Sequence, residues 1–105
     1  MVTPGFGRVT DNDGCTLVTV IDSIDVATAS MLRERLLDLY EQGKRDVVID
    51  LTGVDLIDSS GLGVLVAALK RYRDADGNVR LRSPGRQVRK VLETTGLSRV
   101  FDIVP

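Results

Sequence analysis

The sequence predicts an α/β fold, and three features of the chain lead to this prediction. Short runs of β-branched residues alternate with segments whose apolar residues recur every three or four positions. Turn-forming Gly, Asp and Asn separate the two kinds of segment. Apolar residues make up 43% of the chain and charged residues 28%, which is typical of a globular protein. We therefore expect an α/β sandwich with at least one parallel strand pair, in a single domain over residues 1–105.

The N-terminal part of the chain predicts a β-hairpin. Val9 and Thr10 precede a turn-rich stretch at 11–14, and the following run at 15–21 is rich in β-branched residues. Cys15 falls inside this run, so we expect a small buried apolar side chain there rather than a redox site. A single cysteine forms no disulfide within the chain, which fits a reducing compartment.

A helix and a buried strand are predicted next. Between 29 and 40 the apolar residues recur at helical spacing, with charged side chains between them. Either Asp25 or Thr28 is expected to cap this helix, and Gly43 suits its exit. The short apolar run at 47–49 then predicts a central strand that is covered on its faces.

The second half of the chain predicts another helix, another strand and a closing helix. A loop at 52–58 leads into a helical pattern at 62–72, and the residues at 79–82 alternate as in a strand. The pair at 83–84 supplies a serine for an N-cap and a proline for the first helical position. Gly96 suits the residue that follows the end of this helix.

The composition argues against several classes of function. The chain has no histidine, so it lacks the commonest general base, the usual partner of a nucleophilic serine and the commonest zinc ligand. A net charge of −1 and an aromatic content of 4% argue against direct nucleic-acid binding. The chain shows neither a signal peptide nor an apolar stretch long enough to span a bilayer. We expect a cytoplasmic protein with no membrane insertion, no cofactor and no metal.

The segment from Asp58 to Gly63 breaks a local rule of helix formation. It reads Asp58-Ser59-Ser60-Gly61-Leu62-Gly63, and each glycine inside a helix costs about 1 kcal/mol relative to alanine. Tight packing against the sheet would explain the glycines, and N-capping would explain the serines. A hydroxyl at a helix N-terminus also lies where free N–H groups favour an anion, and missing side chains at Gly61 and Gly63 would let another surface approach. The segment therefore also suits a serine that is phosphorylated and recognised by a partner.

Catalytic or metal chemistry suits this segment less well. A nucleophile elbow needs a glycine before the serine and a histidine to activate it, and a P-loop needs Gly-Lys-Ser/Thr. Asp46, Asp50, Asp55 and Asp58 match the spacing of no calcium-binding loop. We therefore expect a binding protein and not an enzyme.

Three segments of the chain resemble the STAS domain, specifically that of the bacterial anti-sigma factor antagonists. They are Ile24-Asp25-Val26-Ala27-Thr28-Ala29 with Leu32-Arg33, Val48-Ile49-Asp50-Leu51 through Ile57-Asp58-Ser59-Ser60-Gly61-Leu62-Gly63, and Val88-Arg89-Lys90-Val91-Leu92 with Thr95-Gly96-Leu97 and Phe101. Together they extend over nearly the whole chain. One segment departs from the family, because Asp22-Ser23-Ile24-Asp25 stands where the family usually has Gly-Glu-Leu-Asp.

The resemblance implies a fold, a function and a set of residues. The fold would be a single STAS-type domain with a mixed β-sheet of four to five strands and helices mainly on one face. The unphosphorylated protein would bind an anti-sigma factor with serine kinase activity and so release the sigma factor. That kinase would phosphorylate Ser59 to end the binding, and a metal-dependent serine phosphatase would restore it. The partner-binding residues implied are Asp25, Thr28, Asp58, Ser59, Ser60, Gly61, Leu62 and Gly63.

Two alternative functions stay open on the sequence. One is a STAS accessory or structural subunit, for example of a transporter complex, without a phosphorylation switch; such proteins often lack the Ser-Ser-Gly motif. The other is an anion- or nucleotide-binding module, since a helix N-terminus alone can hold a phosphate.

Overall fold

The computed structural model describes residues 9–12 and 14–105, and strands alternate with helices along the chain as predicted. The elements in order are β1 (Val9–Asn12), β2 (Cys15–Thr19), α1 (Val26–Glu41), β3 (Asp46–Asp50), α2 (Ser59–Asp74), β4 (Asn78–Arg82), α3 (Arg86–Thr94), the short 3₁₀ helix η1 (Leu97–Arg99) and β5 (Asp102–Val104). The sequence pattern predicted no element at η1 or β5.

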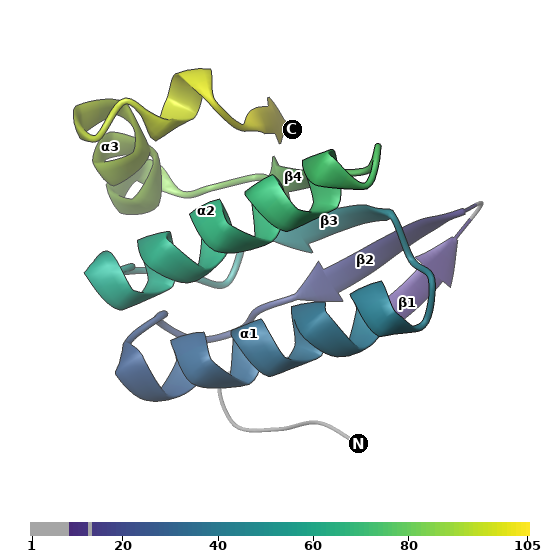
Figure 1. The fold of residues 1–105 in the computed structure, drawn as a ribbon. Helices are drawn as coiled ribbons and strands as arrows, with labels where there is room; N and C mark the ends of the chain where they lie inside the picture. The colour runs from purple at the N-terminus through teal and green to yellow at the C-terminus, as the bar shows by residue number, and fades with distance from the viewer. Residues whose placement is uncertain (1–8, 13) are drawn as a thin grey trace.

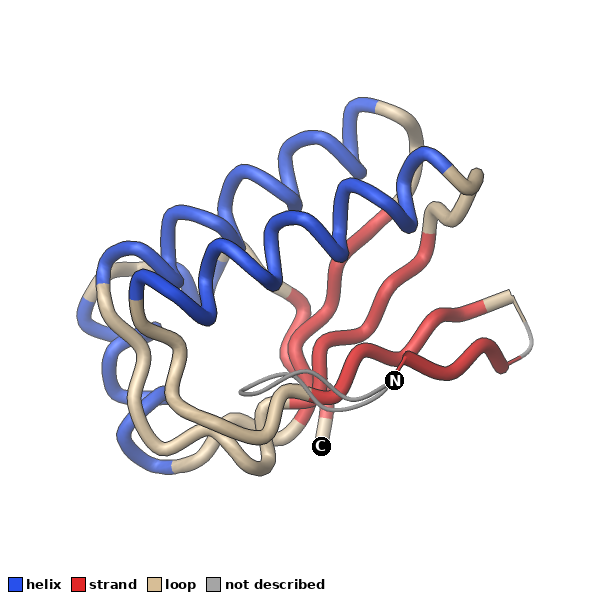
Figure 2. The backbone as a smooth tube through the Cα atoms, turned by 90° about the horizontal axis from the view of Figure 1, so that it is seen from below, coloured by secondary structure: helices blue, strands red, loops and turns tan. Residues whose placement is uncertain are grey.

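The five strands form one mixed sheet in the order β1-β2-β3-β4-β5 (Figure 1). The β1–β2 pair is antiparallel, and the pairs β2–β3, β3–β4 and β4–β5 are parallel. Parallel neighbours need a crossover connection; α1 and α2 provide the first two, and α3 with η1 provides the one from β4 to β5. Figures 1 and 2 show these two helices side by side on the same face of the sheet, whereas α3 lies at the end where the parallel strands finish. The mixed sheet with helices mainly on one face is therefore confirmed.

The core lies between the sheet and the α1–α2 pair, and most of it is aliphatic. Buried and less buried residues alternate along β2 and β4, so one face of each strand points to the helices. The largest fully buried side chains are Tyr72, Ile24, Leu32, Ile49, Leu51, Leu65, Leu81 and Leu92. Burial of one such side chain typically stabilises a fold by about 1.5–3 kcal/mol.

The central strand β3 is covered on one face only. Val47 and Ile49 are fully buried, whereas Val48 between them is half-buried and Asp46 is exposed. The prediction that both faces are covered is wrong, because α1 and α2 pack on the same face. A continuous apolar run of three residues does not distinguish the two cases.

The predicted hairpin is present, with a shorter turn than expected. β1 extends to Asn12, which is opposite Cys15, so Asp11 belongs to the strand and not to the turn. Asp13 lies outside the described residues. Cys15 is half-buried rather than buried, and the guanidinium of Arg80 lies 3.8 Å from its sulfur.

The closing helix begins later than the sequence predicts. The backbone N–H of Ser83 donates to the carbonyl of Val104 at 2.9 Å, and Ser83 has a φ of 51°. An N-cap residue has extended backbone, so this conformation excludes Ser83 from that role. Pro84 belongs to the preceding loop, and Gly85 is the N-cap of α3. The predicted glycines after α1 and α3 are confirmed, since Gly43 and Gly96 both have positive φ.

Tyr72 links the two helices that cover the sheet. Its hydroxyl, on α2, donates to the carbonyl of Leu36 on α1 at 2.8 Å, and its ring packs edge-on against Tyr40 at 5.3 Å between centroids. Burial raises the pKa of Tyr72 from 10.0 to about 12.

The raised pKa of Tyr72 predicts a loss of stability in alkali. Between pH 10.0 and about 12 the unfolded chain releases this proton while the folded chain keeps it. The free energy of unfolding should therefore fall as the pH rises through this window, by at most about 1.4 kcal/mol per pH unit from this group. The Tyr72→Phe variant should be less stable at neutral pH by about 1 kcal/mol. Its free energy of unfolding should also fall less steeply as the pH rises through this window. Urea titrations across the pH range measure the stability and its pH dependence for both proteins. Equal pH dependence in the two proteins would contradict the raised pKa of Tyr72.

Candidate functional site

The starts of α1 and α2 are held together by a short parallel bridge between Ile24 and Ile57. The N–H of Ile24 donates to the carbonyl of Leu56 at 2.9 Å, and the N–H of Asp58 donates to the carbonyl of Ile24 at 3.1 Å. Both helices begin just after these residues, so their N-termini lie side by side at the end where the parallel strands finish (Figure 1). In open α/β sheets, binding sites usually form at this end.

An aspartate caps each of the two helices in the same way. The Asp25 carboxylate accepts hydrogen bonds from the N–H and the hydroxyl of Thr28, at 3.0 and 3.2 Å. The Asp58 carboxylate accepts one from the N–H of Gly61 at 3.1 Å. The Thr28 N–H is the main reason why the pKa of the Asp25 carboxyl lies below its ordinary value. Of the two caps predicted for α1, Asp25 is therefore the one present, and Thr28 is its donor.

The two serines are not the cap of α2. Because Asp58 is the N-cap, Ser59 and Ser60 occupy the first two helical positions, and the expectation of a serine cap is wrong. Ser59 is exposed and Ser60 is half-buried. Within the described residues, neither hydroxyl makes a hydrogen bond. Ser59 therefore has its hydroxyl in solvent at a helix start, where the first N–H groups lack partners inside the helix.

The two glycines of the motif have different surroundings. A Cβ placed on Gly61 would lie 2.5 Å from the Ile24 side chain and 2.7 Å from that of Ile57, so only a glycine fits beside the bridge. A Cβ placed on Gly63 would meet nothing within 4 Å. The expectation that a missing side chain opens the surface is wrong for Gly61, which is buried, whereas Gly63 is exposed.

The structure brings the eight residues implied by the resemblance to one end of the molecule but does not expose them all. Asp25, Asp58, Ser59 and Gly63 are exposed, Ser60 and Leu62 are half-buried, and Thr28 and Gly61 are buried. Leu62 also packs against the core. The exposed members are available to a partner, while the buried ones position the two helix starts.

The sequence analysis did not predict three exposed apolar residues that lie near the bridge. Ile21, Val26 and Leu56 are 53%, 70% and 59% exposed. Leu56 adjoins Ile57 of the bridge, and the other two lie close to Ile24 in the chain. The sequence offered no common signal for them, since Ile21 lies in the run predicted as a strand. The structure places all three in, or directly after, the two loops that the bridge joins.

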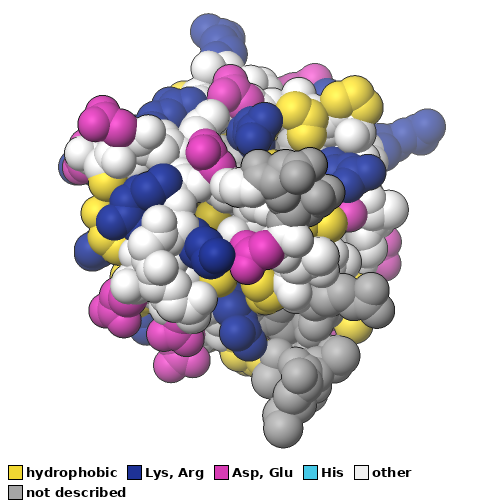
Figure 3. Space-filling model, turned by 90° about the vertical axis from the view of Figure 1, so that its right-hand side faces the viewer, with side chains coloured by type: hydrophobic (Ala, Val, Ile, Leu, Met, Phe, Trp, Pro, Cys, Tyr) yellow, Lys and Arg dark blue, Asp and Glu magenta, His cyan; other side chains and the backbone are white. Residues whose placement is uncertain are grey.

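The loops that lead into α1 and α2 are acidic. Asp22, Asp25, Asp55 and Asp58 are all exposed there, and neither 20–32 nor 50–69 contains a lysine or an arginine. A nearby cation is Arg86 of α3, which lines a cavity together with Asp55 and Leu56. The opposite end, in Figure 3, shows basic and acidic side chains interspersed. In the described part of the chain, no three Asp, Glu or Cys side chains come close enough together to hold a metal ion.

Comparisons with known proteins identify the family and its fold. The STAS domain model matches residues 8–105. An anti-sigma-B factor antagonist of Bacillus subtilis (strain 168) is 36% identical over 95 residues, which are 90% of this chain and 86% of that protein. The crystal structure of an anti-sigma factor antagonist from Mycobacterium paratuberculosis is 27% identical, with a TM-score of 0.82 over 100% of this chain and 91% of that one.

The fold is also that of SpoIIAA of Bacillus, which has been solved in unphosphorylated and phosphorylated forms. The identities are 19% and 18% and the TM-scores 0.81 and 0.75, over 95% of this chain in both cases and 88% and 91% of those chains. No helix in the described part of this chain is both long enough and apolar enough to cross a membrane.

The different surroundings of the two glycines predict opposite effects of the same substitution. Gly61→Ala should lower the free energy of unfolding by about 1–3 kcal/mol, because the new methyl group overpacks the contact with Ile24 and Ile57. Gly63→Ala should raise it by about 0.5–1 kcal/mol, because alanine is the better helix former and the space is open. Urea denaturation of both variants checks this. Equal effects of the two substitutions would show that Gly61 is not held against the bridge.

Proposed function

Because this chain belongs to the STAS domain family, we propose that it is an anti-sigma factor antagonist that regulates transcription by binding an anti-sigma factor. The observation that carries the proposal is Ser59, whose hydroxyl is exposed at the start of a helix that Asp58 already caps. The names of the relatives support it, since a protein 36% identical over 90% of this chain is an anti-sigma-B factor antagonist.

The surface proposed to bind the anti-sigma factor has apolar and charged parts. We call it the switch face and define it as Ile21, Asp22, Val26, Leu56, Asp58, Ser59 and Gly63, all exposed. Its three large apolar side chains supply the area whose burial drives protein association. Gly63 lets a partner approach the helix closely, and the carboxylates favour a partner with basic side chains around its contact surface.

Phosphorylation of Ser59 would change the charge of this face without changing the fold. A phosphoserine carries about −1.5 to −2 charges at pH 7. The N-terminus of α2 stabilises such an anion by about 0.3–1 kcal/mol, whereas the neighbouring carboxylates of Asp58, Asp22 and Asp25 repel it. At an interface the balance differs, because an unpaired charge that loses its water costs about 2–5 kcal/mol. The free domain therefore tolerates the phosphate and the complex does not.

The enzymes of the switch are proposed to be other proteins. The anti-sigma factor itself would act as the serine kinase, and a metal-dependent serine phosphatase would remove the phosphate. ATP and metal then belong to these partners, and the chain acts in the cytoplasm as a binding protein without catalysis of its own. The exposed Ser59 favours this regulatory function over a purely structural role in a larger complex.

Ser59 is expected to be the phosphorylated residue. Incubation of the protein with the cognate anti-sigma kinase and ATP should place one phosphate on Ser59, as read by peptide mass spectrometry. Ser59→Ala should abolish the modification, whereas Ser60→Ala, which changes the half-buried neighbour, should leave it in place. Phosphate on Ser60 alone, or on neither serine, would refute the assignment.

The charge mechanism makes a separate prediction about binding. Ser59→Asp should weaken binding of the anti-sigma factor at least roughly thirty-fold, which corresponds to the lower end of the cost of a desolvated charge. Its melting temperature should change little, and Ser59→Ala should bind as the unmodified protein does. Calorimetric titration and a melting curve for each variant measure this. Gln42→Glu, which adds one negative charge at the far end of α1, is the control and should bind normally; similar weakening by both charges would contradict the mechanism.

A further inference from the structure

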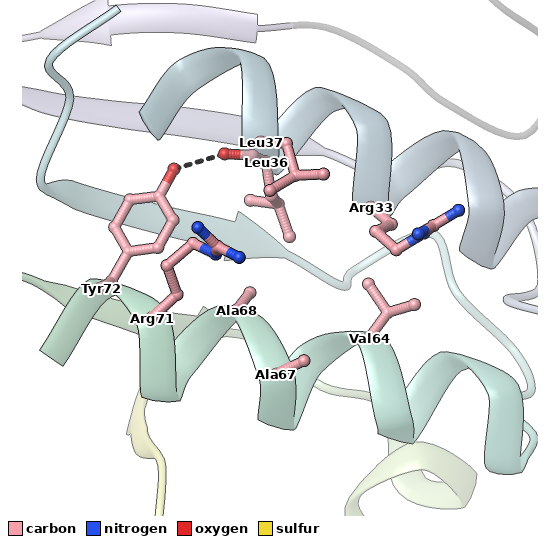
Figure 4. Close-up of a pocket in the computed structure, with 8 residues that line it drawn as sticks. All are labelled: Arg33, Leu36, Leu37, Val64, Ala67, Ala68, Arg71 and Tyr72. Carbon is pink, nitrogen blue, oxygen red and sulfur yellow. Dashed lines mark hydrogen bonds between the residues drawn. The ribbon is translucent and has the colours of Figure 1, made fainter. Parts of the chain in front are cut away.

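An apolar groove runs between α1 and α2 on the side away from the sheet (Figure 4). Its volume is about 150 Å³. The apolar residues that line it are Leu36, Leu37, Val64, Ala67, Ala68 and Tyr72. The two alanines leave the space, because larger side chains at these positions of α2 would fill it.

The size of the groove decides what class of molecule it suits. Sites for drug-sized ligands and cofactors usually have volumes of about 300–1,000 Å³, which is well above this one. A cavity of about 150 Å³ accommodates a group of the size of benzene. The groove therefore fits one large apolar side chain, such as leucine or phenylalanine, projecting from a protein partner.

A cation lies at each end of the groove. Figure 4 shows Arg33 of α1 beside Val64 at one end and Arg71 beside Tyr72 at the other. Seven residues of helix, or about 10 Å, separate the positions of Val64 and Arg71 along α2. Both arginines are exposed, and the guanidinium of Arg71 lies 5.6 Å from the centre of the Tyr40 ring. Among residues 9–12 and 14–105, neither arginine forms an ion pair with a carboxylate.

We propose that this groove is a docking site for an acidic amphipathic helix of a partner protein. One large apolar side chain of that helix would occupy the groove, and carboxylates two turns apart would pair with Arg33 and Arg71. Two turns of helix span about 11 Å, which is close to the rise of about 10 Å along α2 from Val64, beside Arg33, to Arg71. The proposal concerns the outer face of the helix pair and does not depend on phosphorylation of Ser59 or on the identity of the switch-face partner.

The exposed side of α2 allows a third helix to lie along it. Ser59, Gly63 and Ala67 are spaced four residues apart and so occupy the same side of α2. Small side chains at two of these positions permit a close approach of helix backbones. A partner helix in the groove would thus adjoin the switch face.

The test uses the full chain and a synthetic helical peptide. The peptide carries two glutamates two turns apart with two leucines between them, and nitrogen-15 NMR follows the amide signals during its titration. The signals of Arg33, Leu37, Val64, Ala67 and Arg71 should shift with saturation. A peptide with lysine for glutamate, and one with alanine for leucine, should each bind at least about tenfold more weakly.

A matched pair of protein variants isolates the contribution of the two cations. Arg33→Glu with Arg71→Glu should weaken binding of the acidic peptide at least about tenfold, because two attractions become repulsions. Arg86→Glu with Arg89→Glu, the same charge change at exposed sites on α3, should leave binding unchanged. Circular dichroism checks that both variants are folded.

Several results would overturn the proposal. These are no shift of the groove signals, equal shifts with the lysine peptide, or equal weakening by the two variant pairs. Shifts of the groove signals with decanoate but not with the peptide would assign the groove to a small amphipathic ligand. Shifts of the same signals on simple dilution of the protein would assign it to a second copy of this chain. Because no anti-sigma factor enters the experiment, its failure would leave the proposed function standing.

Discussion

The parallel bridge between Ile24 and Ile57 ties together the two loops that lead into α1 and α2. It uses only a few backbone atoms, with hydrogen bonds of 2.9 and 3.1 Å, yet it fixes where both helices begin. The bridge also explains the glycine at position 61, since any side chain there would collide with the isoleucines on either side. The arrangement of the switch face follows from this contact, because Ile21, Val26 and Leu56 lie in, or directly after, the two loops that it pairs.

The cap of α2 is equally important for the proposed switch. A serine that capped the helix would have its hydroxyl engaged with backbone N–H groups and would be a poor phosphate acceptor. Asp58 performs the capping, so the hydroxyl of Ser59 stays in solvent. The same carboxylate then repels a phosphate on its neighbour. Asp22 adds a further negative charge, and its carboxylate is held in place by the N–H of Ser23 at 2.8 Å. A phosphate at Ser59 thus enters a face that is already acidic.

The sequence was most informative where a single residue type determines local geometry. The glycines after α1 and α3 follow from backbone requirements that few other residues meet, and for the cap of α1 the sequence narrowed the choice to Asp25 or Thr28. The start of α3 could not be predicted in this way, because Ser83 is held by a hydrogen bond to Val104, twenty-one positions further on. The role of Gly61 was hidden for the same reason, since the side chains that exclude a Cβ come from two separate loops.

The candidate site shows the same division between local and long-range information. From neighbouring residues alone, the Asp58 to Gly63 motif indicated a helix start and a serine suited to carry a phosphate, while the choice of Ser59 came from the resemblance to the family. The exposed apolar residues around it could not be grouped before the loops were seen to pair. The α1–α2 groove was also invisible, because Arg33 and Arg71 are far apart in sequence and become the two ends of one surface only when the helices pack.

Helix α2 contributes to both the switch face and the α1–α2 groove, because one of its sides is buried in the core and the other is exposed. The inner side, with Leu65, Leu69 and Tyr72, is buried in the core and holds the helix on the sheet. The outer side carries Ser59, Gly63 and Ala67, which are exposed and lack bulk. A modification at the outer N-terminal end can therefore change what docks along the helix without disturbing its packing. The Tyr72 hydroxyl also donates a hydrogen bond to Leu36 on α1, so the packing of the two helices sets the distance between the switch face and the groove. A partner that contacts both must match that distance, which makes the spacing itself a determinant of specificity.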